Sequence, residues 1–323
     1  MIITRSPLRV SLGGGGTDIP SFYKKHQGFV LSAAINKYVF TSVIEPYSNG
    51  YFLKYSQLEN VKTINKIKHP IFREVLKKFR KFKRIEITTL ADIPAGTGLG
   101  SSGSFTNSLI YSLNTLNRNI LSKKNLAECA CDIEINKLKR PVGKQDQYIS
   151  AFGGIKEFKI NKKGNVKVLD LKISLKTIQD LEENLLLFFT GFTRSSSTIL
   201  DKQDKQTKNN SKKIIENLMH VKKMGLITKN LLENNDTHQF GELMKQHWKI
   251  KLQRSDNISN KKINYLYDQA LSNGAIGGKL VGAGGGGFLM FYAKDKKKLV
   301  KKMQSFGIEE LKFKFDFEGT KNI

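Results

Sequence analysis

The sequence is short of cysteine, of acidic side chains and of long apolar runs, and each shortage argues against a class of protein. It has two cysteines in 323 residues, Cys129 and Cys131. Cysteines this close in sequence are poorly placed to bridge one another, and no His or Cys cluster accompanies them to suggest a metal site. We therefore expect two free thiols on one helix, in a reducing compartment rather than in a disulfide-rich secreted domain.

Long apolar runs are missing as well. No stretch approaches the roughly 20 apolar residues that a membrane helix needs. The first twelve residues, MIITRSPLRVSL, read as a strand and lack the pattern of a signal peptide. These features predict a cytoplasmic protein without a membrane partner.

Acidic residues are outnumbered, with 28 Asp and Glu against 55 Lys and Arg, and the formal net charge is +27. Such a balance raises the question of nucleic-acid binding. However, the lysines are spread along the whole chain, and the densest cluster, residues 75–84, has helical spacing with an apolar face. No recognition motif accompanies it. We therefore expect no nucleic-acid partner and, because the field is positive, an anionic small substrate.

The glycine-rich stretch IPAGTGLGSSGSF, residues 93–105, lacks the lysine that ends the common phosphate loop. It lies between a predicted strand and a predicted helix whose start Ser101 or Ser102 could cap. A helix N-terminus offers free N–H groups and a partial positive charge, and glycines let a phosphate approach them. One of the serine hydroxyls can also ligate Mg²⁺. The stretch therefore predicts a nucleotide-phosphate loop that needs no lysine.

Two other interpretations of this loop stay open from the residues alone. A plain turn is one, since glycines often mark turns and nothing more. Dinucleotide binding is the other, because GLGSSG at 98–103 satisfies the GxGxxG pattern. That pattern requires an acid about 20 residues later, where the sequence reads NRNI at 117–120 and two predicted helices follow.

The hydrophobic pattern predicts a strand-rich first half and a helical second half that ends strand, strand, helix, strand. We place the division near residue 180, giving domains 1–180 and 181–323. The strands are expected at 29–47, 51–55, 84–91, 155–160, 165–173, 184–192, within 277–293 and at 310–319, and the helices at 70–82, 101–116, 123–138, 144–152, within 195–273 and at 295–307.

Three motifs in order resemble those of the GHMP kinases: SPLRVSLGGGGTD at 6–18, PAGTGLGSSGS at 94–104 and KLVGAGGGGF at 279–288. The resemblance implies an α+β fold of two domains. An N-terminal ATP-binding domain is expected to resemble domain 2 of ribosomal protein S5, and a C-terminal domain to be ferredoxin-like. ATP, Mg²⁺ and the acceptor are expected in the cleft between them.

Within that family, GKQDQYISAFGG, FFTGFTRSSSTIL and FDFEG are similar to the D-glycero-D-manno-heptose 7-phosphate kinases. This similarity implies ATP-dependent phosphorylation of the anomeric hydroxyl, giving the 1,7-bisphosphate. Fucose kinases share the GGGTD of residues 14–18, so a neutral sugar such as L-fucose is the alternative acceptor. A non-catalytic regulator on the same fold is a further alternative.

The resemblance also implies roles for charged residues. Asp146 matches the catalytic aspartate of the family, and Arg9 stands nine positions before Asp18, as in galactokinases, where the arginine reaches the catalytic centre. Glu134, 12 positions before Asp146, is then expected to hold Mg²⁺ together with Ser102. These residues make up the predicted catalytic centre.

Two neighbours, Asp132 and Glu128, lie on the same predicted helix as Glu134 and could replace it as the metal ligand. For the acceptor phosphate, Arg194 and Arg254 are the candidates, because arginine is scarce here and suits bidentate binding of a phosphate. The remaining candidates are Pro94, Gly96, Thr97, Gly98, Leu99, Gly100, Ser101, Ser102 and Gly103 for the nucleotide, and Gly15, Gly16, Thr17, Asp18, Gly284 and Gly285 for the acceptor.

Overall fold

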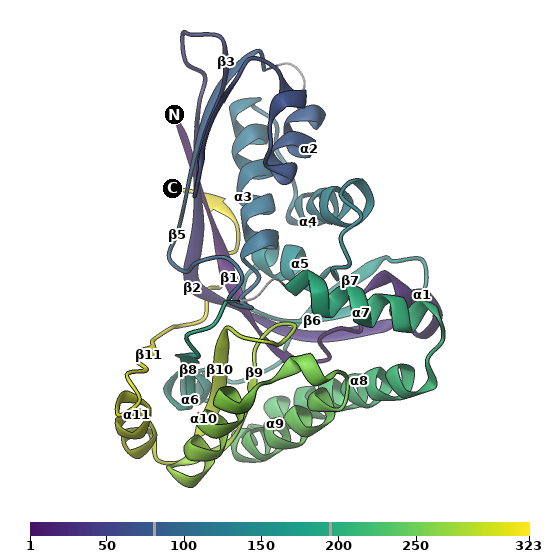
Figure 1. Ribbon diagram of the computed structural model, residues 1–323, viewed down its shortest axis with the longest axis vertical. Helices are drawn as coiled ribbons and strands as arrows, with labels where there is room; N and C mark the ends of the chain where they lie inside the picture. The colour runs from purple at the N-terminus through teal and green to yellow at the C-terminus, as the bar shows by residue number, and fades with distance from the viewer. Residues whose placement is uncertain (80–81, 194–195) are drawn as a thin grey trace.

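A computed structural model describes residues 1–79, 82–193 and 196–323. It contains two sheets, each covered by helices, and the chain ends close to where it begins (Figure 1). Both cysteines are free thiols, as expected. None of the helices built from the described residues combines the length and the hydropathy that crossing a bilayer requires.

In the described part of the chain, the larger sheet has eight strands in the order β12-β1-β2-β5-β3-β4, with β6 and β7 extending from β2. The β3–β5 pair is parallel and the others are antiparallel. The strands are β1 (Ile2–Gly13), β2 (Gly28–Ile44), β3 (Gly50–Lys54), β4 (Leu58–Val61), β5 (Arg84–Ala91), β6 (Ile155–Ile160), β7 (Val166–Asp170) and β12 (Lys321–Asn322).

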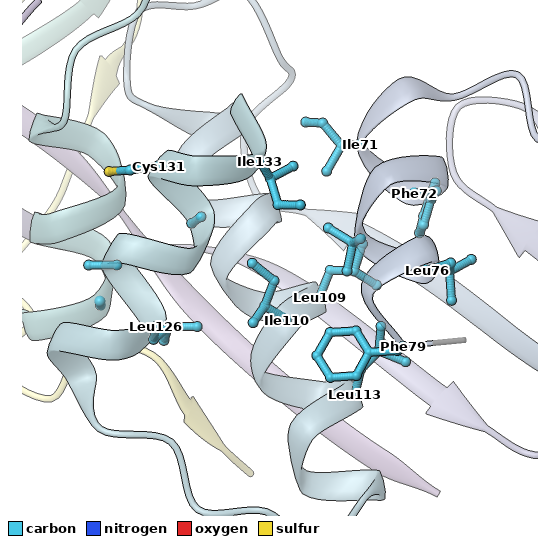
Figure 2. Packing of buried hydrophobic residues seen from close by; sticks show 14 of the residues in the cluster. Ile71, Phe72, Leu76, Phe79, Leu109, Ile110, Leu113, Leu126, Cys131 and Ile133 are labelled. Atoms are coloured by element: carbon cyan, nitrogen blue, oxygen red, sulfur yellow. The ribbon is translucent and has the colours of Figure 1, made fainter. Parts of the chain in front are cut away.

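Helices α2, α3 and α4 cover one face of this sheet and pack on one another through aliphatic and aromatic side chains (Figures 1 and 2). Leu109 and Leu113, one turn apart on α3, are fully buried there; burying a leucine contributes roughly 1.5–3 kcal/mol. This core fixes the start of α3. The elements are α2 (Pro70–Lys78), α3 (Ser101–Leu116), α4 (Lys123–Cys131), α5 (Gln145–Phe152), the π-helix η2 (Asp132–Lys137) and the 3₁₀ turn η1 (Ile64–Lys66).

The smaller sheet has the order β11-β8-β10-β9, and its pairs are antiparallel. Its strand β10 is buried along its whole length, because helical residues such as Ile263 and Leu299 cover one face and strand β1 and Phe240 lie against the other. The elements are β8 (Leu185–Phe189), β9 (Ala275–Leu280), β10 (Phe288–Ala293), β11 (Glu310–Leu311), α1 (Pro20–His26), α6 (Leu175–Asn184), α7 (Ser196–Lys208), α8 (Lys212–Glu233), α9 (Thr237–Leu252), η3 (Asp256–Ile258), α10 (Lys261–Ser272) and α11 (Lys296–Gln304).

One hydrophobic core joins the two sheets. Leu8, Val10 and Leu12 of β1 belong to the same buried cluster as Phe288 and Met290 of β10. Because close-packed interiors resist deformation, this shared core holds the two halves in a fixed relation. The site between them is therefore built on a rigid frame.

Most predicted elements are present, and β5 has the expected bounds. The strand expected at 310–319 is wrong beyond its first two residues, since only Glu310–Leu311 pairs with β8. Farther along, Phe315 forms a single bridge to Ile35 of the larger sheet, so the chain crosses back between sheets instead of extending one. The division at residue 180 falls inside α6 and stays a prediction.

Candidate active site

A cavity of about 690 Å³ lies between the two halves of the molecule. Its walls come from the glycine-rich loop before α3, the loop after β1, the start of α5, the end of α9 and the end of β9. It therefore brings together all three glycine-rich motifs. Of the predicted residues, the cavity is lined by Arg9, Gly15, Gly16, Asp18, Pro94, Gly96, Gly98, Gly100, Ser101, Ser102, Gly103, Glu134, Asp146 and Arg254.

The loop before α3 needs its glycines. Gly96, Gly98 and Gly100 have φ values of 80°, 84° and 82°, in the left-handed region that glycine favours. Gly98 also packs closely on the glycine-rich motif at 279–288, so a Cβ atom at Gly98 would lie 2.7 Å from the carbonyl oxygen of Val281. A side chain at Gly98 would therefore both strain the loop and push the two motifs apart.

Gly100 occupies the N-cap position of helix α3, and no side chain caps the helix within the described residues. The expectation that Ser101 or Ser102 caps the helix is wrong, because the left-handed Gly100 places both serines inside the first turn. The uncapped turn leaves its N–H groups for a ligand. The Ser101 hydroxyl oxygen is buried there and has no hydrogen-bond partner within the described structure, which suits a phosphate oxygen.

Arg9 and Asp146 form a two-point ion pair beside this turn. Arg9 Nε donates to Asp146 Oδ1 at 2.8 Å and Nη2 donates to Oδ2 at 3.0 Å. The backbone N–H of Arg9 donates to Leu99 at 2.9 Å, and its Nη1 donates to the carbonyl of Gly98. Arg9 therefore ties the glycine loop, β1 and α5 together and fixes the direction of the Asp146 carboxylate.

Glu134 is almost fully buried in the π-helix η2, a distortion that is frequent at functional sites. Its Oε1 accepts from Gln147 Nε2 at 2.9 Å and from Thr106 Oγ1 at 3.2 Å. Its Oε2 accepts from Ser102 Oγ at 2.5 Å and from Arg140 Nη1 at 3.2 Å. The structure thus brings Glu134 and Ser102 together, as the metal hypothesis requires.

Arg140 is a residue that the sequence reasoning missed. Its guanidinium donates to Ser102 Oγ at 3.0 Å as well as to Glu134, so a positive charge already lies beside the predicted metal ligands. The described residues contain no group of three His, Cys, Asp or Glu side chains that could hold an ion alone. Mg²⁺ usually takes one or two carboxylates and completes its shell with water and substrate phosphates, so a Ser–Glu pair fits this ion.

Asp18 is buried in the loop after β1, with 4% of its surface exposed. Its Oδ2 accepts from the backbone N–H of Gln145 at 2.9 Å, and its Oδ1 accepts from that of Gly16 at 3.1 Å. Burial raises the pKa of the Asp18 carboxyl above its ordinary value; the hydrogen bond from Gln145 opposes this, and the charge of Asp146 adds to it. A carboxylate held by backbone groups on a cavity wall suits a sugar hydroxyl donor.

Several predicted residues have structural partners instead. The Thr17 hydroxyl bonds the carbonyl oxygens of Gly14 and Phe29, each at 2.8 Å, and so braces the loop. In the glycine run at 282–287, the backbone N–H of Gly285 donates to the carbonyl of Ile258 at 2.8 Å and is therefore not free for a ligand. Gly284 has a φ of 118° and packs on the same isoleucine.

Thr97 and Leu99 are buried behind the glycine loop, where the Thr97 hydroxyl donates to the carbonyl of Pro94 at 3.0 Å. Arg194 lies outside the described residues. Arg254 lines the cavity, where it is joined by three basic side chains that sequence reasoning did not select: His247, Lys251 and Lys279. The helical spacing around His247 did not indicate that this residue lines a cavity. His247 and Lys279 meet because α9 packs against β9, which the local sequence does not reveal.

The comparisons with known proteins agree with the three motifs. The model of the GHMP kinases N terminal domain matches residues 65–154, and that of the GHMP kinases C terminal domain matches residues 228–309. A D-glycero-alpha-D-manno-heptose 7-phosphate kinase of Campylobacter jejuni is 30% identical to this chain over 99% of its length and 98% of the relative. A bifunctional fucokinase/GDP-fucose pyrophosphorylase of Arabidopsis thaliana is 26% identical over 90% of this chain but 30% of that protein.

Solved structures agree on the fold. A D-glycero-D-manno-heptose 1-phosphate kinase from Bacteroides thetaiotaomicron superposes with a TM-score of 0.82 at 23% identity, covering 100% of this chain and 99% of that one. A sugar kinase structure from Campylobacter jejuni superposes with a TM-score of 0.79 at 27% identity, over 100% and 98% of the two chains. The chain belongs to the GHMP kinase family and is an ATP-dependent sugar kinase.

Proposed function

We propose that the chain transfers the γ-phosphoryl group of ATP to the anomeric hydroxyl of D-glycero-D-manno-heptose 7-phosphate, giving the 1,7-bisphosphate and ADP. The observation that carries this proposal is the Arg9–Asp146 pair. It lies against the uncapped start of α3 and opens on the same cavity as Asp18. A phosphate loop, a fixed carboxylate and a sugar-binding carboxylate are the parts that a sugar kinase needs.

The nucleotide is proposed to lie along the glycine loop. The N–H groups of the first turn of α3 and the unpartnered Ser101 hydroxyl face its phosphates. Beyond Pro94 the cavity is bordered by apolar side chains that suit a flat purine base, among them Ile71, Leu90 and Phe105. This end of the cavity is thus assigned to adenine.

Mg²⁺ is proposed to bind between Ser102 and Glu134, whose oxygen atoms already point at one another. Ser102 and Glu134 would hold the ion, which would supply positive charge to offset that of the nucleotide phosphates. Arg140 supplies a second positive charge at the same place. Gln147 and Thr106 hold the other carboxylate oxygen of Glu134, so its Oε2 stays turned toward the cavity.

The chain's own residues then carry the proton. Asp18 orients the sugar by accepting from its hydroxyl groups. The Asp146 carboxylate accepts the proton of the anomeric hydroxyl as that oxygen bonds to the γ-phosphorus, and the bond from phosphorus to the ADP oxygen breaks. Arg9 keeps the carboxylate aimed through its two hydrogen bonds and offsets the negative charge of the centre.

Phosphorylation of a neutral sugar, such as L-fucose, is the second candidate, because a fucokinase is among the relatives. The basic side chains at the acceptor end favour the phosphosugar. The two heptose kinase relatives also differ in name, one acting on a 7-phosphate and the other on a 1-phosphate. These differences define the acceptors that an assay must include.

The test is the initial rate of ADP formation with heptose 7-phosphate, heptose 1-phosphate, unphosphorylated heptose and L-fucose. We expect the 7-phosphate to have the highest kcat/KM by at least tenfold. An equal or higher value for any of the other three sugars would overturn the assignment of the acceptor. We place the reaction in the cytoplasm, where ATP is supplied. We also propose that residues 1–180 and 181–323 are the two domains of the protein.

A further inference from the structure

Three basic side chains and a histidine meet at one corner of the cavity. His247 and Lys251 come from α9, Arg254 follows that helix, and Lys279 comes from β9. Lys251 and Lys279 are 6% and 3% exposed, and His247 is 7% exposed. Lysine side chains are almost never buried to this extent unless they are paired, so this basic corner calls for an explanation.

The partners of these cations are neutral. Lys251 Nζ donates to the carbonyls of Leu280 at 2.8 Å and Gly282 at 2.6 Å. Lys279 Nζ donates to the carbonyl of Leu12 at 2.7 Å and lies 3.2 Å from His247 Nδ1. None of the carboxylates that the structure describes forms an ion pair with either lysine.

Arg254 shows the same pattern. Its Nε donates to the amide oxygen of Asn217 at 3.0 Å and its Nη1 to that of Gln203 at 3.1 Å. Other cations at similar depth are paired, since Arg9 has Asp146 at 2.8 Å and Lys144 has Glu128 at 3.0 Å. The basic corner therefore differs from the rest of the molecule in carrying buried charge without described acidic partners.

The electrostatics of the corner favour an anion. Burial lowers the pKa of Lys279 to about 7 and that of Arg254 to about 10. It also lowers the pKa of Lys251 well below its ordinary value, and the charges of Arg254, Lys279 and Arg9 add to that effect. An anion at this place would offset the mutual repulsion and restore the charged forms.

Among the contacts of the described residues, some donors of the basic corner stay unused and can serve such an anion. Arginine has five N–H donors and lysine has three. The hydrogen bonds of Arg254 use two donors, and those of Lys251 use two. The corner can therefore donate to several oxygen atoms of one phosphate group without giving up its present contacts.

The corner lies on the acceptor side of the cavity. Arg254 Nη1 is 3.1 Å from where a Cβ atom of Gly16 would be, so it stands over the loop that carries Asp18. Lys279 holds the end of β1 that leads into the same loop. The nucleotide elements, by contrast, are the glycine loop and the start of α3.

We propose that Lys251, Lys279 and Arg254 form the subsite that binds the phosphate group of a sugar monophosphate acceptor, with His247 positioning Lys279. This proposal rests on the proposed function and adds to it the residues that distinguish a phosphosugar from a neutral sugar. Only one of them, Arg254, was a candidate from the sequence.

The test compares Lys251→Met with the matched control Lys222→Met. Lys222 is a partly buried lysine that also donates to a backbone carbonyl, that of His26 at 2.8 Å, but it is away from the cavity wall. We expect Lys251→Met to raise KM for heptose 7-phosphate about 10- to 100-fold, the value of one charge-assisted hydrogen bond. KM for ATP and for unphosphorylated heptose should change less than about twofold, and Lys222→Met should alter none of them.

Two results would overturn the subsite. One is an equal rise in KM for the phosphorylated and the unphosphorylated heptose, which would mean that Lys251 does not contact the phosphate. The other is a rise in KM for ATP alone, which would assign the corner to the nucleotide. Arg254→Gln provides a second variant that keeps a polar side chain if Lys251→Met does not fold.

Ligand-induced changes in melting temperature test the phosphate subsite independently of catalytic activity. The wild-type protein should be stabilised more by heptose 7-phosphate than by unphosphorylated heptose, and Lys251→Met should remove that difference. Equal shifts with the two sugars in the wild-type protein would contradict the subsite even if the enzyme is active. Absence of turnover with every sugar would contradict the proposed function, while the difference between the two shifts would still test the subsite.

Discussion

The cavity buries basic side chains at two corners, that of Arg9 and the basic corner, and the two differ in the hydrogen-bond partners of these side chains. At the Arg9 corner the guanidinium has a carboxylate partner at 2.8 and 3.0 Å. At the basic corner Lys251 and Lys279 are as deeply buried but donate to backbone carbonyls. The carboxylate partner stabilises a buried cation within the folded protein. A buried cation without such a partner lowers the stability of the fold, and an anionic ligand can offset this cost. The Arg9 corner thus fixes the direction of the Asp146 carboxylate, and the basic corner is the proposed subsite for the acceptor phosphate.

The largest expected effect falls on the paired corner. Asp146→Asn preserves the shape of the side chain but removes the charge that accepts the proton. We expect kcat to fall on the order of 10²-fold or more. Initial rates at saturating substrate provide the measurement, and the thermal shift with ATP should stay within about 1 °C of the wild-type value as a control on folding. A kcat near the wild-type value would remove Asp146 from the role of the catalytic carboxylate.

Stability should separate the two corners directly. Arg9→Met leaves the Asp146 carboxylate without its partner, and we expect a loss of about 2–3 kcal/mol, because that carboxylate is partly exposed. Lys251→Met leaves no carboxylate unpaired and removes two hydrogen bonds to backbone carbonyls, so we expect a smaller loss of stability than for Arg9→Met. Urea unfolding of both variants measures the difference. If both lose stability to the same extent, the contrast between paired and unpaired charge does not hold.

The pH dependence of stability should sharpen the same contrast. The pKa of Lys279 is lowered by burial to about 7, below its ordinary value near 10.5. Between these values the unfolded chain binds the proton and the folded chain does not, so stability rises as pH increases from about 7 to about 10.5, and this gain is lost as pH falls back to 7. His247 Nδ1 lies 3.2 Å from Lys279 Nζ, and burial lowers the pKa of His247 well below its ordinary value too, with the charges of Lys279, Lys251 and Arg254 adding to that effect.

We therefore expect Lys279→Met to remove about 2 kcal/mol of the stability gain that the wild-type protein shows between pH 7 and pH 9. The measurement is urea unfolding of both proteins at the two pH values. Lys249→Met serves as the control, because it removes an exposed lysine of α9. Parallel pH profiles for the wild-type protein and Lys279→Met would show that Lys279 is protonated alike in the folded and unfolded chains.

A smaller effect is expected at the Ser102–Glu134 pair. Ser102→Ala and Glu134→Ala should each raise the Mg²⁺ concentration for half-maximal rate, roughly tenfold, since each removes one oxygen ligand from an ion that water can partly re-coordinate. Titration of the rate with Mg²⁺ provides the measurement. If neither variant changes the Mg²⁺ dependence, the ligands lie elsewhere, and Asp132 is the next residue to substitute.

The sequence predicted the paired corner better than the basic one. Arg9, Glu134 and Asp146 stand in or near motifs that resemble those of the GHMP kinases, at intervals found in that family, so the resemblance suggested their roles. Lys251 and Lys279 belong to different elements, and a lysine in so basic a chain carries no signal of its own. Their proximity depends on how α9 packs against β9, which is a tertiary contact that no local pattern encodes.

Local patterns failed for a similar reason at two backbone positions. The alternating residues 310–319 have the period of a strand, yet only Glu310–Leu311 pairs with β8. The serines after Gly100 have the chemistry of helix caps, but the left-handed glycine takes the cap position. In both cases the tertiary structure overrides propensity, and in the second it leaves the N–H groups of α3 available to a phosphate.

The most direct test of the central claim is the position of the new phosphate. Purified protein is incubated with ATP, Mg²⁺ and D-glycero-D-manno-heptose 7-phosphate, and the product is analysed by ³¹P NMR, with Asp146→Asn as the matched control. We predict one new resonance coupled to the anomeric proton, formed in step with ADP by the wild-type protein and at most about one hundredth as fast by the variant. A phosphate on any other oxygen, or ADP formation that does not depend on the sugar, would contradict the account.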